Sequence, residues 1–180
     1  MKILILTKPN FSPAVEINDY LWEKGHDVYV TVEALDWGCY DNNFDLGISI
    51  HYTRILKQED INKFKFGVIN IHPSILPYGK GADPIAWGII NNEPLGLTIH
   101  YIDEGIDTGN LLYQQEFFRD SGETAEGFYN AILGHYETEF IRFWEWFYEY
   151  YRKFKYFPDG IPQKKNSIKP HKRKELPWLS

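Results

Sequence analysis

Short apolar runs alternate with amphipathic segments along the first two thirds of this chain. A run of five to seven mostly apolar residues bounded by turn residues is typical of a strand in a parallel sheet. Amphipathic segments between such strands can supply the crossover connections that a parallel sheet requires. The runs that we interpret as strands are residues 2–6, 27–32, 45–50, 66–72, 95–101 and 111–117, with intervening helices predicted at 12–25, 53–62 and 83–92.

This alternation predicts the α/β fold class, with a Rossmann-like, mostly parallel sheet and helices on both of its faces. Only the loop of residues 102–110 separates the last two predicted strands. A parallel crossover needs about a dozen residues or more, so these two strands are either antiparallel or not directly adjacent. We therefore expect a late antiparallel strand pair.

From Ser121 onward, apolar and aromatic residues recur in steps of three and four, which predicts one long amphipathic helix. The stripe is interpreted as core or as a contact between subunits, and a homodimer through this aromatic-rich helix is one expectation. Its positions are Phe128, Ile132, Tyr136, Phe140, Phe143, Phe147 and Tyr151.

Charge is distributed unevenly along the chain. Residues 1–151 carry 10 Lys/Arg and 23 Asp/Glu, whereas residues 152–180 carry 9 and 2. A basic segment can bind phosphate groups, and it can equally pack as a solvated segment on an acidic body. The predicted division is one domain over residues 1–155 and a basic tail over residues 156–180 that packs on the domain or extends from it.

Several classes of function are disfavoured by the sequence. No apolar stretch approaches the roughly 20 residues of a membrane span, and the apolar start is too short for a signal peptide, so we expect a cytoplasmic protein without a membrane partner. Residues 7–12, after the first strand, contain no glycine, which argues against the phosphate-binding loops of NAD and ATP enzymes. Cys39 is the single cysteine and the histidines show no close ligand spacing, so no metal is expected.

A polar pair, Asn70 and His72, stands where the fourth predicted strand ends. Strand residues two apart point to the same face, and α/β enzymes keep their chemistry at the carboxyl ends of strands. Farther along, Asp107 supplies a carboxylate between Gly105 and Gly109. The structural alternative is that Asn70 and His72 only close the strand and that Asp107 only caps a turn.

If the fold brings the three residues together, they suit the attack of an amine on a carbonyl carbon. The amide of Asn70 and an imidazole N–H of His72 can donate to the oxygen of the tetrahedral intermediate. Either His72 or a water held by Asp107 can take the proton of the amine. The carboxylate would also fix the tautomer of the imidazole.

Five sequence blocks around these residues occur in a fixed order. They are Asn70-Ile-His72-Pro-Ser-Ile-Leu-Pro77, Gly79 with Gly81, Pro84-Ile-Ala-Trp87, Gly96-Leu-Thr-Ile-His100 and Asp103-Glu-Gly-Ile-Asp107-Thr-Gly109. Together these blocks resemble the formyltransferase family that uses 10-formyltetrahydrofolate. By that resemblance, the catalytic asparagine, histidine and aspartate of the family fall on Asn70, His72 and Asp107.

The resemblance also implies 10-formyltetrahydrofolate as co-substrate, with its pterin between two loops. The cofactor-binding residues implied in this way are Ile50, Tyr52, Ile55 and Leu56 in the first loop, and Asp103, Glu104, Gly105 and Ile106 in the second. The alternative is that these residues bind no cofactor, with Tyr52 an ordinary exposed residue and Ile55 an ordinary core residue.

Members of the family differ in the amine that they formylate. The glycine-free stretch at residues 7–12 departs from the phosphate loop of glycinamide ribonucleotide transformylases. Methionyl-tRNA formyltransferases carry a second domain, whereas only the tail of residues 152–180 follows the aromatic helix here. The chain looks most like the catalytic core of a sugar N-formyltransferase, so a nucleotide-linked amino sugar is the expected acceptor and a nucleic acid is not. The acceptor pocket is predicted at Lys8, Pro9, Asn10, Phe11, Ser74, Tyr78, Gly79, Lys80 and Trp87.

Three alternatives stay open at the level of sequence. The acceptor could be methionyl-tRNA or another amine, or it could be water, in which case the protein would be a formyltetrahydrofolate hydrolase. A binding domain that keeps the fold without turnover is the third. The identity of the sugar, its nucleotide and the position of its amine do not follow from the sequence.

Overall fold

The computed structural model describes residues 1–40, 43–120, 123–164 and 168–176. Its sheet has six strands in the order β2-β1-β3-β4-β5-β6. The strands are β1 (Lys2–Thr7), β2 (Asp27–Thr31), β3 (Leu46–Ile50), β4 (Val68–His72), β5 (Gly96–Tyr101) and β6 (Leu111–Glu116). The helices are α1 (Ser12–Glu23), α2 (Gln58–Ile61), α3 (Pro84–Asn91), α4 (Ala125–Phe154) and the short 3-10 helix η1 (Arg173–Glu175).

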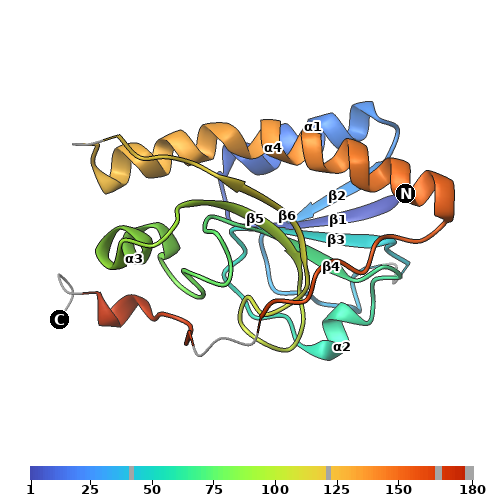
Figure 1. Ribbon diagram of the computed structural model, residues 1–180. Coiled ribbons are helices and arrows are strands. Elements are labelled where there is room, and N and C mark those ends of the chain that lie inside the picture. Colours follow the sequence, from blue (N-terminus) through green and yellow to red (C-terminus); the bar gives the residue numbers. More distant parts are fainter. Residues whose placement is uncertain (41–42, 121–122, 165–167, 177–180) are drawn as a thin grey trace.

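The predicted fold class is confirmed. Strands β1 to β4 are parallel, and helices α1 and α4 lie on one face of the sheet while α2 lies on the other (Figure 1). The helix expected over residues 53–62 is wrong in extent, because only Gln58–Ile61 is helical. Just before it, Leu56 is buried in an apolar cluster with Tyr52 packed against it, and this packing holds the chain in an irregular path. This second apolar cluster, separate from the main core, consists of Leu4, Leu6, Phe44, Leu56, Ile61, Phe64 and Val68.

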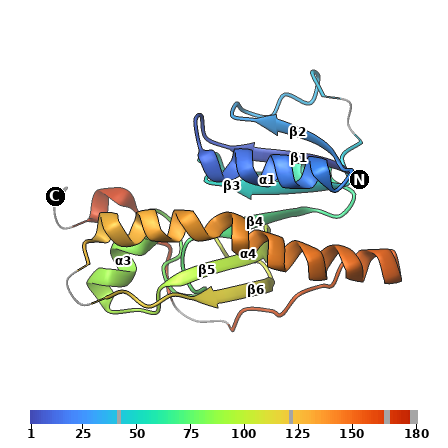
Figure 2. The same cartoon turned by 90° about the horizontal axis from the view of Figure 1, so that it is seen from above.

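The reversal of strand direction involves two antiparallel pairings. Strand β5 runs antiparallel to β4 as well as to β6. Helix α3 lies beyond one end of the sheet and does not cross its face, so the chain re-enters the sheet from the end at which β4 leaves it (Figure 2). This arrangement sets Asn70 directly opposite His100 in the β4–β5 register.

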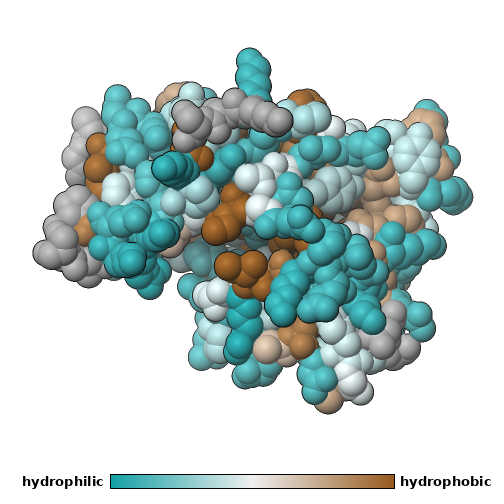
Figure 3. Space-filling model, turned by 90° about the horizontal axis from the view of Figure 1, so that it is seen from below, coloured by the Kyte–Doolittle hydropathy of each residue, from teal (hydrophilic) through white to brown (hydrophobic). Residues whose placement is uncertain are grey.

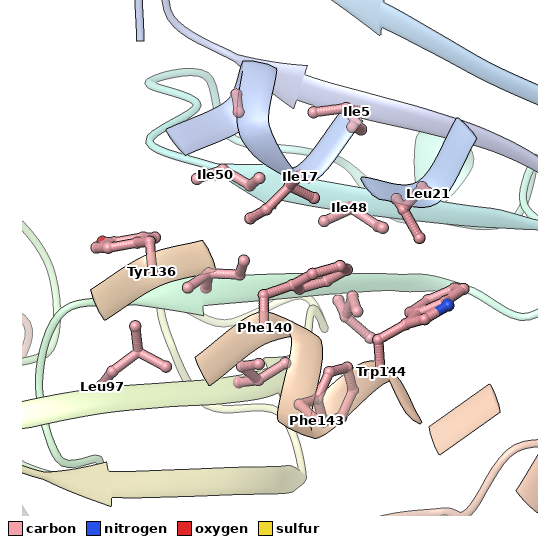
Figure 4. Packing of buried hydrophobic residues seen from close by; sticks show 14 of the residues in the cluster. Ile5, Ile17, Leu21, Ile48, Ile50, Leu97, Tyr136, Phe140, Phe143 and Trp144 are labelled. Carbon is pink, nitrogen blue, oxygen red and sulfur yellow. The ribbon is translucent and has the colours of Figure 1, made fainter. Parts of the chain in front are cut away.

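Helix α4 confirms the predicted long helix, although Ser121 lies outside the described residues. It begins after Thr124, whose side chain accepts a hydrogen bond from the Gly127 amide at 3.0 Å, as expected of an N-cap. Six of the seven predicted stripe residues are buried within this single chain, against α1 and the sheet (Figure 4). Most of the stripe therefore forms core, and a homodimer through this helix stays a prediction.

The buried side chain of His26 should make the stability of the fold depend on pH. The ring of His26 meets the rings of Trp144 and Tyr148 edge-on, with centroids 5.3 and 4.7 Å away. Burial lowers its pKa to about 4. Between the ordinary pKa of histidine and this lowered value, the unfolded chain binds a proton that the folded chain does not. The free energy of unfolding therefore falls as the pH falls through this window.

We expect this histidine alone to remove about 1 kcal/mol of stability between pH 7 and pH 5, after allowance for screening by nearby solvent. Urea unfolding of the wild type and of His26→Phe at the two pH values measures the effect. The variant keeps a ring in the site without a titrating group, so it should lose less stability on acidification. Equal losses in the two proteins would contradict the assignment.

Candidate active site

Polar side chains from β4, β5 and the loop after β5 meet at the carboxyl end of β4. Asn70 and His72 come from β4, His100 from β5 and Asp107 from the following loop. His72 and His100 are buried, and the side chain of Asp107 is 15% exposed. The structure thus brings together the three predicted catalytic residues and adds a fourth, His100, to which sequence reasoning assigned no role.

The imidazole of His72 is oriented by the loop that follows it. Its Nε2 lies 2.9 Å from the carbonyl oxygen of Gly79. A carbonyl only accepts, so Nε2 carries the hydrogen and the neutral ring keeps a lone pair on Nδ1. That Nδ1 faces Asp107 Oδ1 at 3.8 Å, which is too long for a hydrogen bond. The expectation that Asp107 fixes the tautomer is therefore wrong, because Gly79 does so.

His100 orients the amide of Asn70. Its Nδ1 donates to the carbonyl oxygen of Tyr101 at 2.7 Å, which leaves Nε2 as an acceptor for Asn70 Nδ2 at 3.2 Å. Burial lowers the pKa of His100 to about 4, so the ring stays neutral near pH 7 and can keep accepting. His100 could have been placed in the site only from the antiparallel pairing of β4 and β5, which we did not predict from the sequence.

Asp107 is held in an unusual conformation. Its φ is +52°, a left-handed value that few residues other than glycine adopt and that often marks functional sites. Oδ2 accepts a hydrogen bond from the Gly81 amide at 2.8 Å, while Oδ1 lies 3.8 Å from His72 and 3.7 Å from His100.

The carboxyl group of Asp107 is ionised despite its burial. Burial alone would raise its pKa, but attraction to His72, His100 and Lys80 and the hydrogen bond from Gly81 together lower it. Because His100 is neutral near pH 7, the Gly81 amide and the Lys80 ammonium give support that does not depend on this ring being protonated. The arrangement can hold a negative charge beside an imidazole lone pair.

The first loop of predicted cofactor residues packs on the second apolar cluster. Ile50 ends β3 and is buried, Leu56 belongs to the cluster, and Tyr52 rests on it with its hydroxyl donating to the Glu33 carbonyl at 2.8 Å. Ile55 is 77% exposed, so the alternative in which it is an ordinary core residue is wrong.

The second loop turns around Asp103. Oδ1 of this residue accepts hydrogen bonds from the Gly105 amide and the Thr108 hydroxyl, at 3.0 and 2.5 Å. Glu104 and Ile106 are exposed. Ile102, just before this loop, and Tyr52 of the first loop pack against the same cluster, so the two loops are neighbours.

The predicted acceptor residues fall into two groups. In the first, the Lys8 ammonium lies 4.7 Å from the centre of the Phe11 ring, while Pro9 and Asn10 are exposed. The Phe11 ring is buried against His51 and Tyr136. The side chain of Phe11 thus belongs to the core and is not available to a substrate, because hydrophobic burial has already used its surface.

The second group surrounds the loop between β4 and α3. Ser74 is buried and donates to the Tyr78 carbonyl at 2.8 Å, so it shapes the loop, and Gly79 contributes the carbonyl that holds His72. Lys80 is buried, and Tyr78 is 38% exposed. Trp87 stacks on His171 at 4.3 Å and an interplanar angle of 11°, so one face of the ring predicted to stack on a substrate is already covered.

One face of the molecule is hollowed. Seen from the side opposite α1 and α4, hydrophobic residues gather around a hollow near the middle of the face (Figure 3). An open cavity of about 580 Å³ is lined by residues of the loop after β5 and of the segment after α4, and His72 is not among its lining residues. Its lining residues are Phe66, Tyr101, Asp103, Gly109, Asn110, Tyr156, Phe157 and Asp159.

Metal sites and membrane spans each leave a recognisable pattern in a structure. Within the described residues, no group of three or more His, Cys, Asp or Glu side chains could hold a metal ion. No helix in the same part of the chain is both long and apolar enough to cross a membrane.

Comparisons with known proteins agree on one family. The sequence model of the family described as formyl transferase matches residues 31–142. The methionyl-tRNA formyltransferase of Clostridium tetani is 40% identical over 90 residues, 49% of this chain and 29% of that protein. The GDP-perosamine N-formyltransferase of Brucella melitensis is 38% identical over 82 residues, 45% of this chain and 32% of that protein. The chain thus spans about a third of the length of these curated relatives.

A solved structure matches over nearly the whole chain. It is the formyltransferase PseJ from Anoxybacillus kamchatkensis, in complex with UDP-4,6-dideoxy-4-formamido-L-AltNAc and tetrahydrofolate. The two proteins are 32% identical with a TM-score of 0.82, and the match covers 97% of this chain and 87% of PseJ.

Proposed function

Because the chain belongs to the formyl transferase family, we propose that it transfers a formyl group from 10-formyltetrahydrofolate to the amino group of a nucleotide-linked amino sugar. The observation that carries the chemistry is the cluster of Asn70, His72, His100 and Asp107 at the carboxyl end of β4. Each of these groups has a partner that orients it before any substrate arrives. Preorganised polar groups are the main source of catalytic power in such sites.

Asn70 is proposed to stabilise the carbonyl oxygen of the formyl group. When the amine attacks, negative charge develops on this oxygen and a hydrogen-bond donor nearby stabilises it. Asn70 Nδ2 gives one hydrogen to His100 Nε2, and its second hydrogen remains for the oxygen. His100 thus acts through Asn70, because its lone pair keeps the amide from turning its own oxygen toward the substrate.

His72 and Asp107 are proposed to handle the proton. The lone pair on His72 Nδ1 can take the proton that the attacking amine must lose, directly or through a water held by Asp107. The resulting imidazolium is stabilised by the carboxylate 3.8 Å away, and its Nδ1–H can then donate to the oxyanion. As the bond from the formyl carbon to the folate nitrogen breaks, the same proton can pass to that nitrogen, which leaves tetrahydrofolate and the formamide.

The two predicted cofactor loops fit a flat ring with polar edges. They lie side by side on the second apolar cluster and present Ile55 and Ile106 to solvent, 77% and 45% exposed. Burying such side chains against a ring would stabilise binding, and backbone groups of the loops would read its edges. 10-Formyltetrahydrofolate supplies the formyl carbon, and PseJ was solved with tetrahydrofolate.

Lys80 supports an acceptor that carries phosphate. The residue is only 5% exposed, and in the described part of the chain no carboxylate forms a direct ion pair with its ammonium. Its positive charge already interacts with Asp107, and a phosphate group of the acceptor would supply a second anion for it to bind. The near-complete match to PseJ, solved with a UDP-linked formamido sugar, favours a nucleotide sugar over tRNA.

The proposal is tested by formyl transfer in solution. Purified protein is incubated with 10-formyltetrahydrofolate and, in separate reactions, with UDP-, dTDP- and GDP-linked amino sugars, methionyl-tRNA, or no amine. We expect one nucleotide sugar to accelerate tetrahydrofolate release and to gain one formyl unit by mass spectrometry. The same sugar with its amine already acetylated is the matched control and should give no acceleration.

The other outcomes each correct the proposal in a defined way. Acceleration by methionyl-tRNA alone would replace the sugar acceptor, and formate release at the full rate without an amine would make the protein a hydrolase. Folate binding without turnover under any condition would reject the enzymatic function altogether.

A further inference from the structure

The segment that follows α4 packs against the loops that surround Asp107. It runs along the outer edge of the sheet beside β6 and then below α3 (Figures 1 and 2). Ile161 and Leu111 exchange two backbone hydrogen bonds of 2.8 Å, which fixes the register of this segment on β6. Two residues farther along, Gln163 faces the loop that carries Asp107.

Gln163 holds the backbone at Asp107. Its Nε2 donates to the carbonyl oxygens of Asp107 at 3.0 Å and of Gly109 at 2.9 Å. Because both partners are acceptors, the amide must present its nitrogen to them, and Oε1 is left buried without a partner. A buried amide oxygen without a hydrogen bond is rare and costly, so this orientation needs an explanation.

A second anchor of the same tail acts on the other side of Asp107. The His171 amide donates to the Lys80 carbonyl at 2.8 Å, and the Ala82 amide donates to the His171 carbonyl at 3.1 Å. These two bonds bracket Gly81, whose own amide donates to Asp107 Oδ2. The backbones approach so closely that a Cβ on Gly81 would overlap the His171 carbonyl oxygen.

An ion pair and a ring stack secure this second anchor. Arg173 gives two parallel hydrogen bonds of 2.8 Å to the Asp83 carboxylate, a bidentate geometry that is both strong and directional. Asp83 is the residue immediately before α3, and Trp87 of α3 stacks on His171. The loop of residues 80–83 is thereby tied to the tail at both ends.

We infer that Gln163 is a positioning residue for Asp107, and that the tail is a part of the catalytic machinery. Gln163 keeps the backbone of Asp107 in its left-handed conformation, while the His171 segment keeps the Gly81 amide aimed at Oδ2. With Oδ2 held, Oδ1 stays turned toward His72. This inference rests on the proposed function, because it assumes that Asp107 takes part in formyl transfer.

The test compares Gln163→Met with Asn110→Ala. Methionine keeps the length of the side chain and removes both hydrogen-bond donors. Asn110 offers a matched control, because its Nδ2 donates to the Asp159 carbonyl at 2.9 Å, a side-chain bond that ties the same tail segment to the sheet edge without touching Asp107. Each protein is assayed with the acceptor that the wild type uses.

In Gln163→Met we expect kcat to fall by about 10 to 100-fold with both KM values unchanged, as for a small misplacement of a catalytic group. In Asn110→Ala we expect kcat to stay within about twofold of the wild type, since Asp107 keeps its supports. A second readout needs no turnover: in the free protein, hydrogen exchange of the Gly81 amide should accelerate in Gln163→Met and not in Asn110→Ala.

The inference is overturned if Gln163→Met has the kcat of the wild type, if it changes only KM, or if Asn110→Ala loses as much. An inactive wild type with every acceptor and with water would instead reject the proposed function. Hydrogen exchange of the Gly81 amide would still test whether Gln163 supports Asp107. If Gln163→Met does not fold, Arg173→Met takes its place, with accelerated Gly81 exchange as support and unchanged exchange as refutation.

Discussion

Replacing Asp107 by asparagine is expected to lower the kcat of formyl transfer by about a thousandfold, since the loss of general acid–base support costs two to four orders of magnitude. The variant removes the charge that stabilises protonated His72 at 3.8 Å. The asparagine side chain has one oxygen and one NH2 group in place of two oxygens. If its oxygen keeps the hydrogen bond from the Gly81 amide, its NH2 group must face His72. Single-turnover formyl transfer with saturating substrates measures the loss.

His72→Ala should lose a similar factor, and the double variant should be little slower than either single one. Residues that act as a unit give strongly non-additive losses. Asp19→Asn, the same chemical change on the exposed side of α1, is the control and should retain full activity. Independent, multiplying losses at Asp107 and His72 would contradict a shared proton-handling role.

Truncation of Phe140 is expected to cost the largest share of stability. The ring is fully buried where α4 packs on α1 and the sheet, stacked on Trp144 at 5.6 Å and edge-on to Tyr20 at 6.4 Å. Phe140→Ala removes this burial and leaves a cavity, for which we expect a loss of about 4 kcal/mol in the free energy of unfolding. Urea denaturation followed by circular dichroism measures it.

Phe118→Ala provides the matched control for the same substitution. Phe118 is 87% exposed. Its truncation should therefore change stability by no more than about 0.5 kcal/mol, as is usual for surface substitutions. Losses of equal size at the two positions would show that residue type, and not burial, sets the cost. A small loss at Phe140 would mean that the neighbouring rings collapse into the cavity.

The strands and the long helix were predictable because their signals are local. All six strands lie within two residues of their predicted ends, since each is a short run bounded by turn residues, and four of them, β1, β3, β4 and β5, are largely buried. The aromatic stripe of α4 likewise follows from helical periodicity alone. The helix predicted at residues 53–62 is shorter than expected, because Thr53 resembles an N-cap whereas the burial of Leu56 decided the path of the chain before Gln58.

The site was predictable only in part. Asn70 and His72 are two residues apart in one strand, so their shared face follows from strand geometry. His100 entered the site through strand pairing, which depends on the direction of β5. Trp87 and Phe11 were assigned to substrate because aromatic residues near a site can serve either core or ligand, and their partners His171 and Tyr136 lie far along the chain.

Local chemistry in the chain thus determined the order of the elements, the polar pair at the end of β4 and the presence of a carboxylate in the loop after β5. Tertiary structure alone decided which groups orient them: Gly79 for His72, His100 for Asn70, and Gly81 with Gln163 for Asp107. The physical reason is that a hydrogen bond requires two groups within about 3 Å. Residues 56 positions apart, as Asp107 and Gln163 are, reach that distance only when the whole chain has folded.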